Sequence, residues 1–149
     1  MKQTSQNFYL DVSIVSRQGL SYQSLALAIN LQGSVGELGI RYGHAALLSL
    51  LPPGAIDVKC ASCEKNIFYI SGGILEVRSN KVIILSDFMQ NAKNLDELVI
   101  KKSILNIKEL IRVSQDNAKQ LHSSYLALAR ANAQLKAIRL FMGKKCSGI

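Results

Sequence analysis

The spacing of apolar residues changes once along this chain, near residue 88, and that change limits what the chain can fold into. Before it, apolar runs are short, as in the alternating segment 9–15, and they stop at turn signals such as Pro52-Pro53-Gly54. After it, apolar residues recur every three or four positions, which is the period of one helix face: Ile100, Ile104, Ile107 and Ile111. The pattern predicts an α+β chain, with a β-sandwich or barrel over residues 1–88 and an antiparallel two-helix hairpin over residues 89–149.

The predicted hairpin carries its own start and stop signals. Asn94 with Glu97 three residues later resembles a capping box, and the polar segment 114–117 would turn the chain and cap a second helix. Alanines on the second helix would face the partner helix and let the two axes approach closely. That face of the second helix contains Leu126, Ala129, Ala133, Ala137 and Leu140. Because one stripe per helix makes a poor core, we expect the hairpin to dock on the β domain, on a partner protein, or on both in turn. The alternative is a hairpin permanently packed on its own sandwich.

Charge is concentrated in the helical half. Of the 18 Lys and Arg residues 11 lie beyond residue 88, against four of the 10 Asp and Glu residues. A basic hairpin favours a negatively charged partner, and nucleic acid is the first general candidate. However, the chain has no Trp, and Tyr125 and Phe141 are the only aromatic residues of that half, which leaves little for base stacking. An acidic protein surface explains the charge as well. We therefore expect no nucleic-acid partner, and a small basic nucleic-acid-binding protein is the alternative function.

Three cysteines give an odd number, which argues against a disulfide framework. Cys60 and Cys63 have the spacing of a zinc knuckle, but a tetrahedral zinc site needs four ligands. The other candidates, Cys146, His44 and His122, form no second paired motif. A thioredoxin-like pair belongs at the start of a helix, whereas this pair lies between two strand-like runs. We therefore expect a hairpin turn with incidental thiols and no metal site, and a thiol or redox protein is a third function class.

No uncharged apolar run approaches the ~20 residues that a membrane helix requires. The first seven residues are polar and lead into a strand-like segment, so neither a signal peptide nor a long transit peptide is expected. The protein should stay in the compartment in which it is made, as a soluble or peripheral protein. Its C-terminal tail around Cys146 should be frayed.

Two glycine-rich segments carry the most specific information. Residues 36–45 read GELGIRYGHA, and residues 69–77 read YISGGILEV. Together they resemble the signatures of the epsilon subunit of bacterial F-type ATP synthases, and the resemblance continues to the alanine-rich segment near the C-terminus. It implies a β-sandwich followed by a two-helix hairpin, and a non-catalytic subunit of the central stalk, or rotor. Such a subunit couples the catalytic head to the membrane c-ring during proton-driven ATP synthesis.

The resemblance also implies partners and contact residues. Glu37 matches the carboxylate that lies against the c-ring, and His44 matches a position near the gamma subunit. Without the resemblance, Glu37 would be interpreted as a solvated turn residue and His44 as a structural histidine. Members of the family can extend their C-terminal helices to an acidic segment of the beta subunits and so restrain ATP hydrolysis. The residues that would form this basic regulatory helix are Lys101, Lys102, Lys108 and Arg112. The implied location is peripheral, on the cytoplasmic face of the bacterial inner membrane, with membrane association only through the complex.

Catalysis and nucleotide binding are not expected. Neither Glu37 nor His44 has a nucleophile or second base nearby in the sequence, so no catalytic, metal or cofactor-binding residue is assigned and no cofactor is expected. Some bacterial members of the family bind ATP at the start of the first helix through the motif [IL]-D-x-x-R-A. Here Val99 and Ile100 replace its Arg and Ala, which removes the guanidinium that recognises phosphate.

Overall fold

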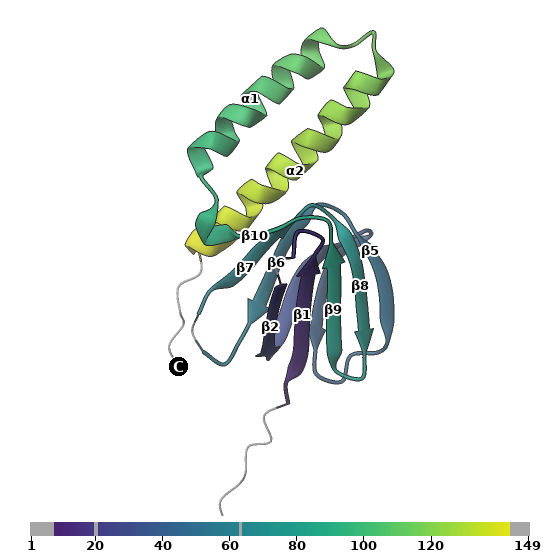
Figure 1. The fold of residues 1–149 in the computed structure, drawn as a ribbon, viewed down its shortest axis with the longest axis vertical. Coiled ribbons are helices and arrows are strands. Elements are labelled where there is room, and N and C mark those ends of the chain that lie inside the picture. Colours follow the sequence, from purple (N-terminus) through teal and green to yellow (C-terminus); the bar gives the residue numbers. More distant parts are fainter. Residues whose placement is uncertain (1–7, 20, 63, 144–149) are drawn as a thin grey trace, which may run out of the picture.

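The computed structural model describes residues 8–19, 21–62 and 64–143, which form two five-stranded sheets and a helical hairpin (Figure 1). In spatial order, the first sheet contains β2 (Ser21–Ala26), β1 (Leu10–Ser16), β9 (Lys81–Ser86), β8 (Gly73–Arg78) and β5 (Leu47–Leu51). The second contains β10 (Met89–Asn91), β7 (Asn66–Ile70), β6 (Gly54–Lys59), β3 (Ala28–Gly33) and β4 (Gly36–Arg41). The expected α+β architecture, a β-sandwich followed by an antiparallel two-helix hairpin, is confirmed.

The two sheets enclose one apolar core. Alternation along β1 turns Leu10, Val12 and Ile14 inward, as their period-two spacing predicted, and they join a buried cluster with residues of the second sheet such as Ile29 and Ile56. β1 pairs antiparallel with β2 on one side and parallel with β9 on the other. The N-terminal strand is therefore held inside the first sheet by a strand from far along the chain.

The helical half begins with a short 3-10 helix, η1 (Ala92–Asn94), and continues with α1 (Glu97–Val113) and α2 (Ala118–Gly143). The expected polar break between the helices is confirmed, because Ser114 follows α1 as its C-cap and the Asn117 side chain accepts from the Gln120 N–H at the start of α2. The apolar stripe of α1 faces α2. The cluster between the helices contains Ile100, Ile104, Ala131, Leu135 and Ile138.

The capping residue of α1 was predicted wrongly. Asn94 is the last residue of η1, and the N-cap of α1 is Asp96. The Asp96 carboxylate accepts from the N–H groups of Leu98 and Val99 at 2.9 and 3.3 Å. Leu95 has an extended backbone that separates η1 from α1, so the helix starts two residues later than a cap at Asn94 would allow.

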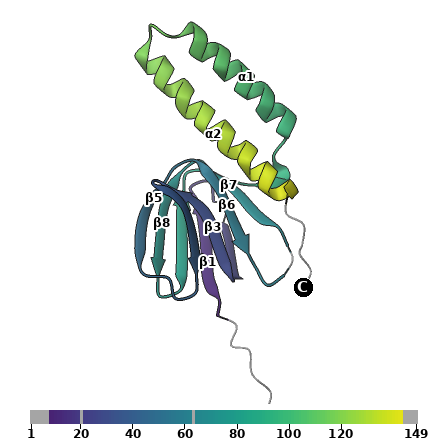
Figure 2. The ribbon, with the colours of Figure 1, turned by 180° about the vertical axis from the view of Figure 1, so that it is seen from behind.

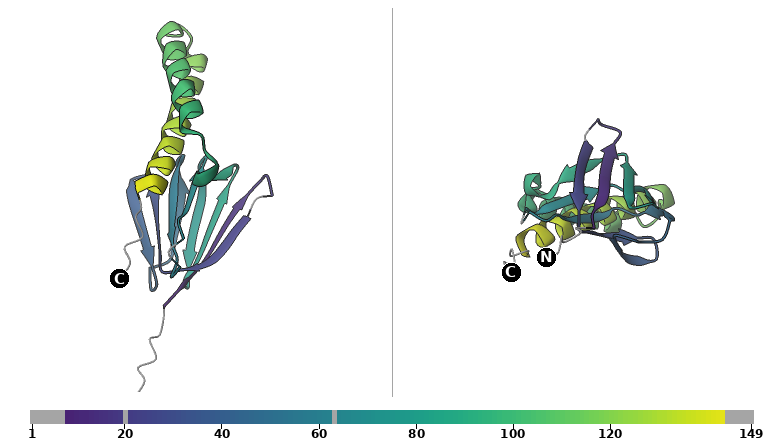
Figure 3. Two further views of the ribbon diagram at one scale, coloured as in Figure 1. Left: turned by 90° about the vertical axis from the view of Figure 1, so that its left-hand side faces the viewer. Right: turned by 90° about the horizontal axis from the view of Figure 1, so that it is seen from below.

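The packing partners of α2 also differ from the expectation. Ala133 and Ala137 were expected to face α1, but they pack on the second sheet, in a cluster with Ala55, Ile67 and Tyr69. α2 has partners on two sides, so the side toward α1 uses a neighbouring stripe instead: Ala131, Leu135 and Ile138. Only the C-terminal half of α2 lies over the sandwich, and the rest of the hairpin projects beyond it (Figures 2 and 3).

The second sheet continues past Phe88, because Met89–Asn91 pairs antiparallel with β7. Cys63 and the expected frayed tail around Cys146 lie outside the described residues. Within the described ranges, no helix is both long and apolar enough to span a membrane.

Candidate functional site

Glu37 lies on the exposed edge of the sandwich. β4 is the last strand of the second sheet, and Glu37 pairs there with Gln32 near the turn between β3 and β4. Gly36 in this turn has a φ of +145°, a conformation that favours glycine. The Glu37 side chain is 78% exposed, and its Oε1 accepts a hydrogen bond from Lys136 Nζ of α2 at 3.0 Å. The carboxylate is open to a partner and already contacts the helical hairpin.

His44 lies in the loop that joins β4 to β5. The His44 backbone N–H donates to the Arg41 carbonyl oxygen. The Gly43 backbone N–H donates to Asn80 Oδ1 at 2.7 Å, which ties this loop to the turn between β8 and β9. The ring Nδ1 lies 2.7 Å from the Ala45 carbonyl oxygen. Since a carbonyl oxygen can only accept, Nδ1 is the donor of this contact, and in the neutral ring Nε2 is then an acceptor.

Glu37 and His44 do not form one site. Glu37 is near the start of β4, and His44 follows its end. A strand advances about 3.3 Å per residue, so about 13 Å of strand separates Glu37 from Arg41 alone. The arrangement suits contacts with two different partners and gives no acid–base pair.

The four predicted basic residues of α1 are all exposed, but their surroundings differ. Lys101 Nζ lies 2.7 Å from Glu97 Oε1, one turn earlier on the helix. Arg112 donates to both carboxylate oxygens of Glu109 at 2.6 and 3.1 Å, and this contact lowers the pKa of Glu109. Two lysines have no acidic side chain within ion-pair distance in the described part of the chain: Lys102 and Lys108.

The outer face of the first sheet carries an apolar row that the sequence analysis missed. The strand register aligns four exposed side chains across four strands: Val15, Leu85, Ile74 and Leu50. Their exposed fractions run from 38% for Val15 to 69% for Leu50. A sheet with one face in water normally keeps that face polar. The sequence did contain a signal for this row. The segments LLSLL of β5 and VIIL of β9 place apolar residues on both faces of the strand, and not only on the buried face.

The glycine pair of the YISGGILEV segment is required by the backbone. Gly72 has a φ of +114°, a backbone conformation that residues with a side chain rarely adopt. At Gly73 a Cβ atom would lie 2.0 Å from the Leu85 carbonyl oxygen, a distance that no side chain tolerates. The segment therefore forms a tight connection between β7 and β8.

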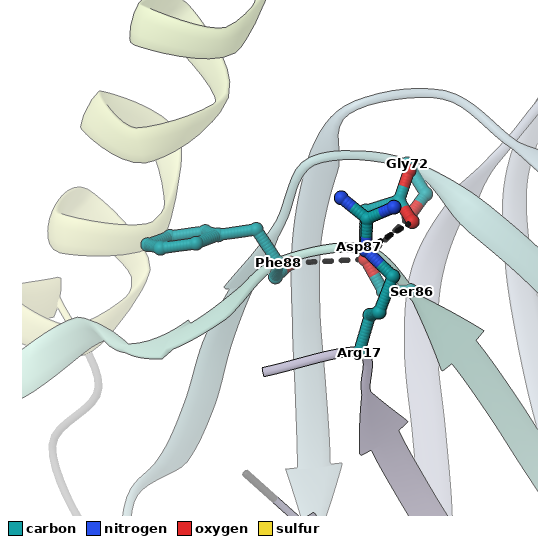
Figure 4. A network of polar contacts seen from close by, with 5 residues as sticks. All are labelled: Arg17, Gly72, Ser86, Asp87 and Phe88. Atoms are coloured by element: carbon teal, nitrogen blue, oxygen red, sulfur yellow. Dashed lines mark hydrogen bonds and ion pairs between the residues drawn. The ribbon is translucent and has the colours of Figure 1, made fainter. Parts of the chain in front are cut away.

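Polar contacts fix the same end of the sandwich (Figure 4). Ser86 Oγ lies within hydrogen-bonding distance of the Gly72 and Phe88 carbonyl oxygens, at 2.5 and 2.9 Å. Arg17 forms an exposed ion pair with Asp87. The Phe88 ring points toward α2 while its carbonyl group is held by Ser86 (Figure 4). The network thus fixes the backbone where the chain leaves the first sheet on its way to the hairpin.

Cys60 follows β6, and the antiparallel pairing of β6 with β7 confirms the predicted hairpin turn. Its Sγ lies 3.4 Å from Ser24 Oγ and 3.7 Å from the Tyr22 hydroxyl group, whose pKa is raised to about 12 chiefly by burial. Among the described residues, no group of three or more His, Cys, Asp or Glu side chains could hold a metal ion.

The two residues that depart from the ATP-binding motif have structural positions of their own. Val99 is exposed, whereas Ile100 is only 6% exposed and belongs to the cluster between the two helices. Ile100 therefore stabilises the hairpin.

Sequence comparisons place the chain among known proteins. Residues 9–92 match the family described as ATP synthase, Delta/Epsilon chain, beta-sandwich domain. The ATP synthase epsilon chain of Francisella tularensis subsp. mediasiatica is 36% identical over 130 residues, which cover 87% of this chain and 89% of the relative. The epsilon chain of Francisella philomiragia subsp. philomiragia is 35% identical over 135 residues, covering 91% and 92%.

Solved structures share the fold. A chain in the cryo-EM structure of the Euglena gracilis mitochondrial ATP synthase, OSCP/F1/c-ring, has a TM-score of 0.78 at 20% identity and covers 88% of this chain and 82% of that chain. A chain in the central stalk and c-ring structure of the Tetrahymena thermophila mitochondrial ATP synthase has a TM-score of 0.55 at 19% identity, covering 87% and 96%. At these identities the likeness shows the fold alone, and membership rests on the sequence matches. By those matches the chain belongs to the epsilon-chain family of F-type ATP synthases, the non-catalytic subunits of the central stalk.

Proposed function

We propose that the sandwich joins the gamma subunit of the central stalk to the membrane c-ring and so couples the catalytic head to proton-driven rotation. The observation that carries this proposal is the exposed apolar row of the first sheet, Val15, Leu85, Ile74 and Leu50. A contiguous apolar patch on the exposed face of a sheet favours a protein partner, because docking removes its surface from water. The row ends on β5, and β5 directly follows the loop that carries His44. Leu50 is near the end of β5, whereas His44 precedes its start and lies beside the β8–β9 turn, so the row and His44 would contact gamma at two separate points of this sheet.

The c-ring contact is assigned to Glu37. An exposed carboxylate at a sheet edge can accept charge-assisted hydrogen bonds from Arg side chains or from backbone N–H groups of a partner. Its separation from His44 along β4 lets the sandwich contact two partners at once. The subunit would be a peripheral component on the cytoplasmic face of the bacterial inner membrane, attached only through the complex.

The hairpin is proposed to restrain ATP hydrolysis in an extended state. It has an apolar cluster of its own between α1 and α2, so it could leave the sandwich without losing that core. Lys102 and Lys108, which form no ion pair within the described ranges, would then contact an acidic segment of the beta subunits, together with Lys101 and Arg112 on the same helix.

The apolar row is tested by placing a charge within it. Ile74→Asp should abolish co-purification of the gamma subunit with this chain, because docking would bury an unpaired carboxylate. Leu25→Asp is the matched control, since Leu25 is an exposed residue on β2 of the same sheet, outside the row. Circular dichroism would verify that both variants fold. Undiminished co-purification of gamma with a folded Ile74→Asp variant would disprove docking through the row.

A further inference from the structure

The ion pair between Glu37 and Lys136 connects the sandwich to the hairpin across 99 positions of sequence. Lys136 precedes Ala137, which packs on the second sheet, and its Nζ reaches Glu37 Oε1 on the edge strand at 3.0 Å. Lys65 holds the end of the same helix, because its Nζ donates to the Phe141 carbonyl oxygen at 2.7 Å and lies 5.3 Å from the centre of the Phe141 ring. The docked position of α2 thus depends on the apolar cluster that Ala133 and Ala137 form with the second sheet and on two charged tethers.

The two tethers use groups of different kinds. Lys65 binds a carbonyl group in the last turn of α2, where a cation is favourable and no partner contact is assigned. Lys136 binds the carboxylate that we assign to the c-ring. Both members of this pair are exposed, at 78% for Glu37 and 47% for Lys136, so another cation can compete for the carboxylate.

A cleft beside the pair gives access to Glu37 while α2 is docked. The cleft has a volume of about 360 Å³ and lies between α2 and the strands β3 and β4. Half of the residues that line it are polar, so an entering polar side chain keeps hydrogen-bonding partners, and Gly39 contributes no side chain to obstruct it. Polar residues lining it include Asn30, Gln32 and Asp57. A partner cation that reached Glu37 by this route would repel the Lys136 ammonium group.

We propose that Glu37 is shared, so that its engagement by a cation or N–H donor of the c-ring releases the Lys136 tether and weakens docking of the hairpin. This proposal rests on the proposed function of Glu37. Coupling of this kind is reciprocal: the factor by which the c-ring weakens docking equals the factor by which docking weakens c-ring binding. Seating of the stalk on the ring would thereby shift the hairpin toward its undocked state.

The tether itself is tested in the full chain. Docking is measured by electron–electron distance spectroscopy between nitroxides at Gln23→Cys and Asn132→Cys, both exposed positions, with the natural cysteines replaced by Ser. Lys136→Met should lower the ratio of docked to undocked chains by roughly two- to five-fold, as expected for an exposed ion pair. Lys119→Met, at the far end of α2, is the control and should change nothing. The charge-swapped variant Glu37→Lys with Lys136→Glu should restore docking.

The decisive measurement is the affinity of the chain, in complex with its gamma subunit, for purified c-ring in detergent. Lys136→Met should raise this affinity by roughly two- to five-fold, because Glu37 is no longer shared. Lys119→Met should leave it unchanged. Glu37→Gln should lower it and should also remove the effect of Lys136→Met in the double variant. If Lys136 had a merely structural role, its replacement would not raise the affinity of the chain for the c-ring.

The outcomes distinguish the sharing of Glu37 from the c-ring contact of Glu37 on which it rests. If Glu37→Gln lowers the affinity but Lys136→Met does not raise it, the shared carboxylate is disproved and the c-ring contact stands. If Glu37→Gln has no effect on the affinity, the c-ring contact at Glu37 is disproved, and the sharing with it.

Discussion

Gly73 shows how closely the two strands of the β8–β9 hairpin approach each other. A Cβ atom there would meet the Leu85 carbonyl oxygen at 2.0 Å, and that oxygen belongs to backbone that cannot rotate away. At the neighbouring Gly72 a Cβ atom would lie 3.1 Å from the Leu51 carbonyl oxygen, and this residue has a positive φ as well. The glycines of this segment therefore have a structural explanation that does not depend on any partner.

Gly73→Ala should lower the free energy of unfolding by about 1–3 kcal/mol, because the methyl group can fit only if β8 and β9 move apart. Gly39→Ala is the matched control, since a Cβ there would make an ordinary contact of 3.4 Å with Asn30 Oδ1. Urea denaturation of both variants measures the difference. Equal stabilities would show that β8 can shift without cost, contrary to this explanation.

Among the secondary-structure elements, α1 shows most clearly how a cap decides where a helix begins. The Asp96 carboxylate satisfies two N–H groups that the first turn leaves without helical partners. Asn94 lies two residues earlier, in η1, and caps nothing in α1.

Asp96→Ala should therefore destabilise the chain by about 1 kcal/mol. Asn94→Ala should have little effect. Asn94 accepts from the Gln90 side chain through its backbone carbonyl oxygen, which alanine also has. Thermal unfolding followed by circular dichroism at 222 nm compares the two. A larger loss at Asn94 than at Asp96 would contradict the assigned cap.

These elements also show what the sequence can and cannot predict. The alternation along β1 and the isoleucine stripe of α1 identify buried faces, because local period alone decides which residues share a face. The choice between Asn94 and Asp96 depended on the extended backbone of Leu95, and two residues with capping chemistry on either side of Leu95 look alike in sequence. Likewise, the direction of Ala133 is set by the position of the sandwich, which no period within α2 encodes.

The candidate site was predictable only in part. Glu37 and His44 stand in recognisable segments, so a resemblance could single them out. The contact of Glu37 with Lys136 depends on how α2 lies across the sheet and has no local signal. The apolar row was missed because its four members come from four strands and become neighbours only through the register.

At the scale of the whole molecule, the sandwich and the hairpin are joined by a limited interface. The C-terminal half of α2 covers Ala55, Ile67 and Tyr69, and the rest of the hairpin projects beyond the sandwich (Figure 3). Such an arrangement permits removal of the hairpin without opening the core between the sheets.

Truncation after Asn94 should raise ATP hydrolysis by the assembled enzyme and leave its assembly intact, because β10 and η1 are kept. Four basic residues of α1 are neutralised in a second variant: Lys101, Lys102, Lys108 and Arg112. It should show part of the same increase in hydrolysis, and the difference from the unchanged chain should shrink at high salt. ATPase assays on purified complexes measure both effects. Unchanged hydrolysis in both cases would mean that the hairpin is structural and does not inhibit.

The parallel pairing of β1 with β9 has a consequence for the order of folding during synthesis. β1 is made first, but its parallel neighbour β9 is complete only at Ser86. Residue pairs such as Asp11 and Lys81 must therefore come into contact across most of the sandwich sequence. Contacts so distant in sequence make folding slow, because the entropy of closing a long loop is lost before the contact forms. On the ribosome β1 can pair with β2 alone until β9 has emerged, so the first sheet closes only when synthesis has reached the helical half.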